Sequence, residues 1–240
     1  MFPSAITHFW HRRFLVGEPL YHDDTFTLCE DPALAHDRRA MLLNTCDGRS
    51  MAVLTPTLAR QLALQHRPLR AQADLRQALA QAGVRLHGAD RVFHFSELAV
   101  QALLQEPEPD DGLRPLGAQD QALFQAFRGA APAQELDEAY VELDHWLVYG
   151  AFAQGPLVSA ASLYPWDETR EIVDLGVITL PAWRGHGHAR RVVRAICRHA
   201  LARGYQPQYR CQLDNVASSA LARAAGLTLF GTWEVVSPEA

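Results

Sequence analysis

One segment constrains the fold of this chain more than any other: an apolar strand that passes through a glycine loop into a long helix. It reads Val-Ile-Thr-Leu-Pro-Ala-Trp-Arg-Gly-His-Gly-His-Ala over residues 177–189. Gly185 and Gly187 allow the backbone to turn sharply. The helix expected from Gly187 to Arg203 directs its first N–H groups and the positive end of its dipole at this loop. The segment therefore predicts a phosphate-binding turn, to which Arg184 adds a positive charge.

The common nucleotide signatures do not match this loop. The third glycine of the dinucleotide motif, counted from Gly185, is replaced by Arg190. The P-loop needs a lysine, and all 22 basic residues of the chain are arginines. A catalytic lysine is excluded for the same reason, and NAD and ATP are poor candidates for the ligand. The strong use of arginine suggests a GC-rich, bacterial genome.

Composition places the chain among globular proteins. Hydrophobic residues make up 48% of its 240 residues and charged residues 20%, which excludes collagen-like, disordered and coiled-coil classes. The net charge of −5 argues against a dedicated binder of nucleic acid or of anionic membranes. The four cysteines form no CxxC pair, so we expect neither a zinc knuckle nor a disulfide framework, and a reducing compartment.

Two segments could be mistaken for targeting or membrane sequences. Residues 1–16 carry their arginines after the apolar residues, the reverse of the order in a signal peptide. The uncharged stretch from Trp146 to Trp166 is interrupted by Gln154-Gly155-Pro156, which favours two strands joined by a turn. We therefore expect a soluble, cytoplasmic protein with no membrane partner.

An acidic, proline-rich segment divides the chain. Glu106 to Asp111 contains two prolines and four acids, which allow neither helix nor buried strand. We expect a linker at 106–111 between a mixed α/β domain at 1–105 and a second domain at 112–240. In the first domain the elements expected are a helix over 33–43, a strand over 51–54, helices over 58–64 and 75–82, and a hairpin of 84–87 with 91–95.

The first domain carries no chemical motif. It could be a degenerate second half of the same type as the other domain, or a module that shapes a substrate cleft or a homodimer interface. In the second domain the elements expected are strands over 113–116, 146–152, 157–164, 171–180, 208–213 and 227–236, and helices over 122–127, 136–143, 187–203 and 216–225. The fold class is therefore α/β or α+β.

Two motifs in this order resemble the GNAT superfamily of acyl-CoA-dependent N-acetyltransferases. The family signature Q/R-x-x-G-x-G/A is met by Arg184, Gly187 and Ala189, and its strand motif by Val177 and Thr179. A second element follows as Asn215-Val-Ala-Ser218, with Leu221 and Gly226-Leu227 behind it. The resemblance spans about residues 112–236 and implies a mixed, mostly antiparallel sheet flanked by helices.

The resemblance also implies a cofactor site. The backbone of Val177, Ile178 and Thr179 would bind the pantetheine arm and the acyl carbonyl of acetyl-CoA, and Asn215 and Ser218 would contact the distal side of that arm. The pyrophosphate would lie on the loop formed by Arg184, Gly185, His186, Gly187, His188, Ala189 and Arg190. The reaction implied is direct acyl transfer to an amine, borne by a small molecule or a peptide, without a metal.

One position departs from the family pattern. Many relatives have a tyrosine one residue after the Leu221 position, where it protonates the departing thiolate, and this chain has Ala222. The proton would then come from water or from a hydroxyl such as Ser218, Ser219 or Tyr164. The departure also supports an alternative, a catalytically inactive acyl-CoA-binding regulator.

The attacking amine must be neutral, so a base or a water chain is expected near the cofactor strand. Glu171 stands where many relatives keep a catalytic glutamate, whereas Asp174 has the opposite strand parity, so that only one of the two would face the cleft. Glu142, Asp144 and His145 are further candidates. His186 and His188 are expected to be loop residues and not metal ligands, since no third ligand is visible. A nucleic-acid-binding arginine helix is a weaker third alternative.

Overall fold

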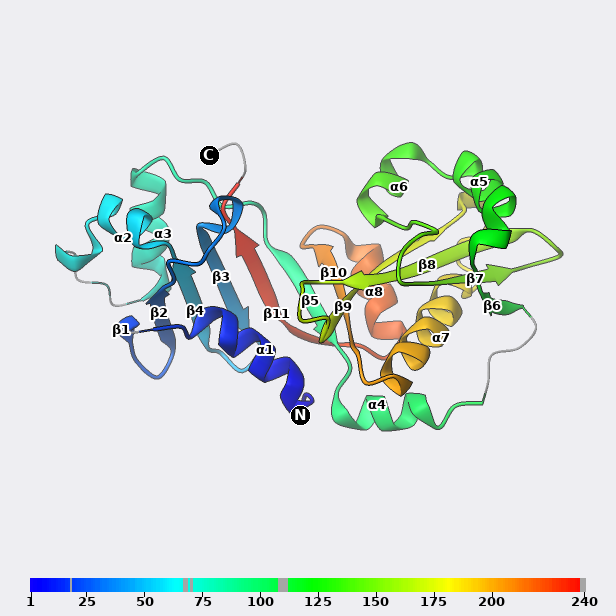
Figure 1. Ribbon diagram of the computed structural model, residues 1–240, viewed down its shortest axis with the longest axis horizontal. Coiled ribbons are helices and arrows are strands. Elements are labelled where there is room, and N and C mark those ends of the chain that lie inside the picture. Colours follow the sequence, from blue (N-terminus) through cyan, green and yellow to red (C-terminus); the bar gives the residue numbers. More distant parts are fainter. Residues whose placement is uncertain (18, 67–68, 70, 108–111, 238–240) are drawn as a thin grey trace. The chain divides into compact units, whose positions relative to one another are not determined.

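The computed structural model describes residues 1–17, 19–66, 69, 71–107 and 112–237 (Figure 1). It has a mixed α/β fold, in which a mostly antiparallel, open sheet is flanked by helices. The chain divides into two compact units, neither of which is contiguous in sequence. The first unit contains Met1–Ile6, Phe93–Arg210 and Val216–Thr228, and the second contains Thr7–Val92, Cys211–Asn215 and Leu229–Ala240. Of the linker expected at 106–111, residues 108–111 lie outside the described residues.

The second unit is built on five strands in the order β1-β2-β4-β3-β11. Only the β2–β4 pair is parallel. Its core joins these strands to two helices through buried side chains such as Leu42, Leu58 and Leu75. The elements are α1 (Ser4–Phe14), β1 (Pro19–His22), β2 (Phe26–Glu30), β3 (Ala40–Thr45), β4 (Ser50–Leu54), α2 (Pro56–Gln61), α3 (Gln72–Gln81) and β11 (Thr228–Val235).

Several expectations for this part are confirmed. The strand at 51–54 is β4, and Thr55 caps α2 by accepting a hydrogen bond from the backbone N–H of Leu58. The helix expected to begin after Asp74 starts slightly earlier, so Asp74 lies in its first turn and accepts from the N–H of Ala71 at 3.1 Å.

Two expectations for this part are wrong. The helix predicted over 33–43 is replaced by a short 3-10 turn at His36–Arg38 and by β3. Met41 and Leu42 are buried on opposite faces of β3, which pairs with β4 on one side and with β11 on the other. A strand covered on both faces gives a continuous apolar run that sequence periodicity does not distinguish from a buried helix.

The predicted hairpin of 84–87 with 91–95 does not form either. Only its second arm is a strand, β5 (Asp90–His94). The first arm bonds to the end of the chain instead: the N–H of His87 donates to Val235 O, and the N–H of Ser237 donates to Arg85 O. The backbone groups of the first arm are satisfied by a segment far away in sequence.

The first unit carries five strands in the order β10-β9-β8-β7-β6. The last two residues of β5 belong to this unit, and β5 lies beside β10. All pairs from β6 to β9 are antiparallel, and β9–β10 is parallel. The elements are α4 (Glu97–Leu104), β6 (Leu113–Pro115), α5 (Gln121–Ala130), α6 (Ala133–Ala139), β7 (Leu147–Phe152), β8 (Leu157–Pro165), β9 (Ile172–Thr179), α7 (His188–Ala202), β10 (Gln206–Gln212) and α8 (Val216–Ala224).

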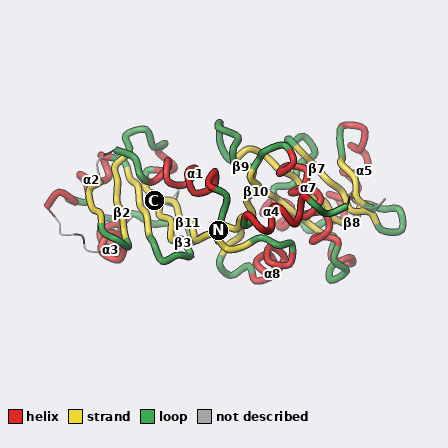
Figure 2. Tube along the Cα trace, turned by 90° about the horizontal axis from the view of Figure 1, so that it is seen from below, coloured by secondary structure: helices red, strands yellow, loops and turns green. Residues whose placement is uncertain are grey.

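Two helix layers cover this sheet, and Figures 1 and 2 show the helices beside the strands. On one face, Phe124 and Phe127 of α5 form a core with Ala160 and Ile178, and the end of α6 packs on β9. On the other face lies α7, where His199 Nδ1 hydrogen-bonds the hydroxyl of Tyr149 at 2.8 Å. We call these the α6 face and the α7 face. The strands and helices expected from 113 to 225 are confirmed, although α6 ends earlier than predicted because Tyr140 takes a left-handed conformation with φ 47°.

No described helix has the length and apolar character needed to cross a membrane.

Candidate active site

One edge of β9 is open along its second half. β9 and β10 pair in register from Ile172 opposite Gln206 to Leu175 opposite Tyr209, whereas β9 continues to Thr179 and β10 to Gln212. On its other edge β9 stays paired with β8 as far as Thr179. The residues of β9 beyond Leu175 therefore offer backbone groups that are not used in pairing with β10.

The alternation of the strand shows which backbone groups these are. Leu180 N–H donates to Val158 O, and Ser159 Oγ donates to Ile178 O, so the even-numbered backbone groups point toward β8. The N–H and C=O of Val177, and the N–H of Thr179, therefore point to the open edge. Among the three residues that the sequence assigned to the acyl arm, Val177 and Thr179 have this orientation and Ile178 does not.

The turn after β9 is the glycine loop, and it has the expected conformation. Gly185 and Gly187 have φ of 78° and 81°, and a Cβ built on either would meet no atom within 4 Å. Gly187 is the N-cap of α7, and Arg191 N–H is the first to bond back to its carbonyl. The preceding helical N–H groups, of His188, Ala189 and Arg190, have no acceptor within the helix. A row of N–H donors without an acceptor inside the helix, at the positive end of a 15-residue helix, is suited to bind phosphate.

The side chain of Arg184 does not face this row of donors. Its guanidinium forms an ion pair with Glu135 of α6, and its Nε donates to Thr179 O at 3.2 Å. The ion pair and the hydrogen bond of Arg184 therefore link α6 to the end of β9. Arg194 is occupied as well, since it binds Glu106 and the carbonyl of Ala225.

His188, in the same loop, has a ring nitrogen whose role the fold itself does not require. Its ring packs against Trp183 and His186, and its Nδ1 is buried without a hydrogen-bond partner among the described residues. Burial lowers the pKa of His188, with further lowering from Arg191 and His186, so the ring is neutral near pH 7. A neutral ring with an unused nitrogen at the start of α7 fits a polar ligand. The described residues contain no group of three or more side chains placed to hold a metal ion.

The second predicted motif lies at the start of α8. Asn215 directly precedes this helix, and Ser218 lies in its first turn. The hydroxyl of Tyr209 from β10 donates to Ser218 Oγ at 3.3 Å. Ala222, at the position where many relatives have a tyrosine, is fully buried. The sequence gives no indication of Tyr209, because nothing in the alternating strand 206–212 shows that its hydroxyl reaches α8.

A buried network surrounds Asp174 on the α6 face of the sheet. Asp174 is 3% exposed and accepts hydrogen bonds from Tyr164 on one neighbouring strand and from Gln208 and Arg210 on the other. Arg210 also stacks on Trp166, with its guanidinium carbon 4.3 Å from the ring centroid. Gln208 is fully buried, and its Oε1 has no partner among the residues described.

The three residues predicted as catalytic do not lie together on one face of the sheet. Tyr164 projects on the α6 face, where burial and Asp174 raise the pKa of its hydroxyl, so it stays protonated. Ser218 bonds to Tyr209, which alternates with Gln208 and so projects on the opposite face. Glu171 precedes β9, is half-buried, and has the parity opposite to Asp174. Tyr164 and Ser218 therefore do not act on the same side of the sheet.

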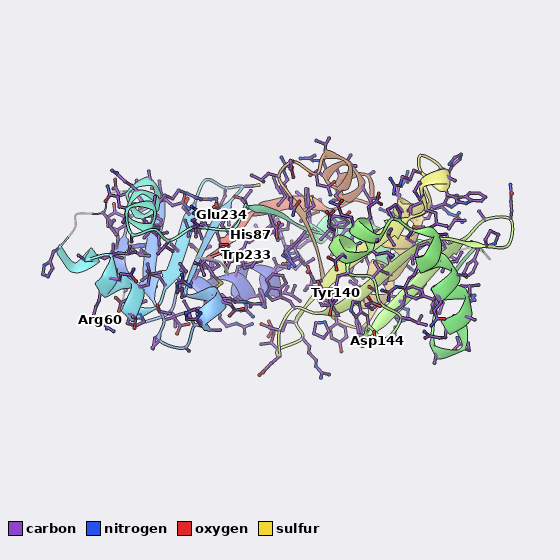
Figure 3. The ribbon with its side chains drawn as sticks, turned by 90° about the horizontal axis from the view of Figure 1, so that it is seen from above. Arg60, His87, Tyr140, Asp144, Trp233 and Glu234 are labelled. Atoms are coloured by element: carbon purple, nitrogen blue, oxygen red, sulfur yellow. The ribbon has the colours of Figure 1, made fainter. Side chains whose placement is uncertain are left out.

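A second cluster lies beside this network on the α6 face. His145 packs against Tyr140 and Tyr164, with ring centroids 4.8 and 4.9 Å away, and its Nδ1 lies 2.8 Å from the hydroxyl of buried Ser162. Burial lowers the pKa of His145, and the charges of Asp144 and Glu142 offset part of that shift. Tyr140 and Asp144 belong to the segment between α6 and β7, and both are labelled in Figure 3.

The two carboxylates of this segment differ in their partners. Glu142 forms an ion pair with Arg128 of α5. Asp144 is exposed at the surface.

One family model matches part of the chain. Residues 120–227 match the model of the acetyltransferase (GNAT) family. No curated protein matches the chain.

One solved structure shares the fold, and two others match with lower TM-scores. A GNAT-family acetyltransferase from Colwellia psychrerythraea matches with a TM-score of 0.53 and 20% identity, over 80% of this chain and 78% of its own. A putative GNAT acetyltransferase from Novosphingobium aromaticivorans matches with a TM-score of 0.47 and 21% identity, over 64% of this chain and 65% of its own, somewhat less than two thirds of its length. An aminoglycoside N-acetyltransferase in complex with CoA matches with a TM-score of 0.39 and 20% identity, over 49% of this chain and 92% of its own.

The open edge of β9, the glycine turn and the helix that follows it are the parts that carry the family signature, and they lie inside the matched range. Residues 120–227 of this chain therefore belong to the GNAT acetyltransferase family.

Proposed function

We propose that this protein is an N-acetyltransferase that moves an acetyl or other short acyl group from acyl-CoA to an amine by direct attack. The observation that carries the proposal is the open edge of β9 leading directly into the N-terminus of α7. A pantetheine arm is a chain with amide groups, and it can pair with an open strand edge as another strand would. The phosphates at its other end then meet the N–H row of the glycine turn.

The donor groups fit coenzyme A in chemistry and in order. Gly187 leaves open space where a side chain would stand, and His188 supplies a buried, unused ring nitrogen. Bound acyl-CoA supplies the reactive thioester. The chain's part is then to hold the acyl carbonyl against the N–H of Val177 and to fix the direction from which the amine approaches. A fixed N–H aimed at the developing oxyanion lowers the barrier because the donor needs no reorganisation during the reaction.

Protonation of the departing thiolate is assigned to Ser218. Its hydroxyl is held by Tyr209, which has its own proton to pass on, so the pair replaces the tyrosine that Ala222 cannot provide. Tyr164 is a poorer choice, since its proton is directed to Asp174 on the other face. The acceptor we propose is an amine of a small molecule or a peptide.

Calorimetric titration with CoA and with acetyl-CoA tests the cofactor site. Gly187→Glu should abolish binding, because the new carboxylate fills and repels the phosphate site. Gly204→Glu is the matched control, since Gly204 follows the other end of α7 with a φ of 85° and equally open space. Both substitutions strain a left-handed residue, so their melting temperatures should fall alike, whereas only the first should lose CoA.

The outcomes separate the candidate functions. Binding that only Gly187→Glu abolishes, with acetyl transfer to any amine, supports the enzyme. Equal CoA affinity with no turnover would favour the inactive acyl-CoA-binding regulator, for which Ala222 is the supporting observation. A parent protein that binds no acyl-CoA would refute both.

A further inference from the structure

The two faces of β9 offer an incoming amine different surroundings. The α7 face is covered at this point by the helix whose first turn receives the phosphates. On the α6 face, the even-numbered side chains of β9 run from Asp174 through Gly176 to Ile178, and the chain of α6 ends directly over Gly176. Beyond that end the segment 140–145 carries polar and aromatic side chains that are exposed or half-buried. An amine that approaches β9 from the α6 face would meet this segment.

His145 is a titratable group of this segment, and its ring is held in a fixed orientation. Ser162, to which its Nδ1 is bonded, is fully buried on β8 and lies directly opposite Gly176 in the antiparallel register. The rings of Tyr140 and Tyr164 pack on the imidazole from two sides. The ring is thus fixed one strand away from the open edge that begins after Leu175. Its Nε2 has no hydrogen-bond partner among the residues that the structure describes.

The groups around His145 decide whether this nitrogen is protonated. Glu142 and Asp144 lie on its own segment, Tyr140 comes from the end of α6, and Tyr164 from β8, with the Asp174–Arg210 pair behind the tyrosine. Tyr164 is protonated, and the carboxylate of Asp174 is held by Arg210. Burial of the imidazole outweighs the two nearby carboxylates, so the pKa of His145 lies below its ordinary value and the ring is neutral at pH 7.

We propose that His145 is the general base of the transfer reaction, held in place by Ser162, and this proposal rests on the proposed acyltransferase function. Nδ1–H donates to Ser162 Oγ, which leaves the lone pair of Nε2 free. Nε2 takes one proton from the acceptor ammonium, directly or through one water. The nitrogen lone pair then forms a C–N bond to the thioester carbon.

The remaining steps balance the reaction. Collapse of the tetrahedral oxyanion breaks the C–S bond, and the electron pair leaves on sulfur. The second proton of the nitrogen goes to the thiolate by way of the hydroxyl pair of Ser218 and Tyr209, or of water. The imidazolium releases its proton to solvent, so the net products are the amide, CoA thiol and one proton.

Glu171 is the competing candidate, and its position is less favourable. It precedes β9 and has the parity of Val173 and Leu175, which is that of the α7 face. Its backbone N–H bonds to Thr169 and its carbonyl to Gln206, so it belongs to the paired end of the strand. The open edge begins at Gly176, five residues later.

The test compares His145→Gln with two single variants, Glu171→Gln and His199→Gln. His199 is the matched control, because its Nδ1 also bonds to a hydroxyl, that of Tyr149, but on the α7 face. Two reactions are followed over pH 5 to 9 with the full chain: acetyl transfer from acetyl-CoA to spermidine, and hydrolysis of acetyl-CoA, which needs no amine. CoA affinity and melting temperature are measured on the same samples. The pKa of each histidine is read from its ring carbon signals by NMR.

We expect His145→Gln to lower kcat/KM by about 100-fold, the usual contribution of a general base. It should also remove the acidic limb of the pH profile, leave CoA affinity within threefold, and remove a ring signal with a pKa below the ordinary histidine value. Ser162→Ala should lower kcat more than it changes KM, because the imidazole of His145 remains but loses the hydrogen bond that fixes its orientation. His199→Gln should keep the acidic limb.

Other results would overturn the proposal. If His145→Gln keeps the rate and the pH profile, or if Glu171→Gln is the variant that loses the acidic limb, His145 is not the base. A parent protein that binds CoA but catalyses neither reaction contradicts the proposal and favours the inactive regulator. A parent protein without affinity for CoA refutes the proposed function itself.

Discussion

Gly176 of β9 lies against the carbonyl oxygen of Ala139, the last residue of α6. A Cβ at position 176 would be only 2.1 Å from that oxygen and 3.1 Å from the side chain of Val141. The absence of a side chain on β9 therefore sets how closely the end of α6, and with it the segment that carries Tyr140 and His145, approaches the cofactor strand.

Gly176→Ala should separate these two elements. We expect a loss of roughly 2 kcal/mol in the free energy of unfolding, because a backbone oxygen cannot yield as a flexible side chain can. Acetyl transfer should fall more than CoA affinity, since the open edge of β9 lies on its β10 side, whereas α6 and the His145 segment lie over one face of the sheet. Gly88→Ala is the control, because a Cβ there meets nothing within 4 Å. Urea unfolding and calorimetry measure the two effects, and equal stability of both variants would contradict this account.

The close approach at Gly176 shows where sequence reasoning reaches its limit. The path from strand to turn to helix at 172–202 is predictable, because the apolar run, the two glycines and the helical period all favour the same elements. The outward direction of the Val177 and Thr179 backbone follows from strand alternation once β8 is known to be the partner. The role of Gly176 depends on α6, which is distant in sequence, and no local pattern indicates it.

The Asp174 network could not be predicted from the sequence, for a related reason. Strand alternation indicates only that either Asp174 or Glu171, and not both, faces the cleft. Its partners Gln208 and Arg210 come from β10, and they reach it because the parallel register sets Gln208 directly opposite Asp174. The wrong helix prediction at 33–43 has the same origin, since neighbouring strands, and not the local residues, decide that β3 is a strand.

Asp174→Asn should be strongly destabilising. Arg210 is 24% exposed and would lose the carboxylate that compensates its charge, and removal of one partner from a buried pair costs about 3 kcal/mol. Asp47→Asn is the matched control: Asp47 and Arg49 are 50% and 58% exposed, so that pair should contribute less than about 1 kcal/mol. Chemical unfolding at pH 7 compares the two variants. Similar losses would mean that water reaches the Asp174 pair more freely than its burial indicates.

Asp144→Asn should shift the acidic limb of the activity profile. The charge of Asp144 favours the imidazolium of His145 and so raises its pKa, partly offsetting the lowering by burial. Without this charge the pKa of His145 falls further, and activity persists to lower pH. Asp137→Asn, which removes a carboxylate on α6, should leave the limb in place. NMR titration of the His145 ring checks the shift, and a shift to higher pH would contradict the assigned cause.

His94 should make the stability of the protein depend on pH. It is fully buried on β5, and its Nδ1–H donates to Pro207 O at 3.1 Å. Burial lowers the pKa of His94 to about 4, although Pro207 and Asp174 favour the charged ring. The unfolded chain binds this proton near pH 6.5 and the folded chain does not, so the free energy of unfolding should fall as the pH drops from about 6.5 to 4. The loss amounts to roughly 3 kcal/mol, because each pKa unit corresponds to about 1.4 kcal/mol.

His94→Asn keeps a donor for Pro207 and should flatten this dependence in urea unfolding series, whereas His22→Asn, at an exposed histidine bonded to Thr27, should not. An unchanged slope in His94→Asn would show that other groups cause the acid instability.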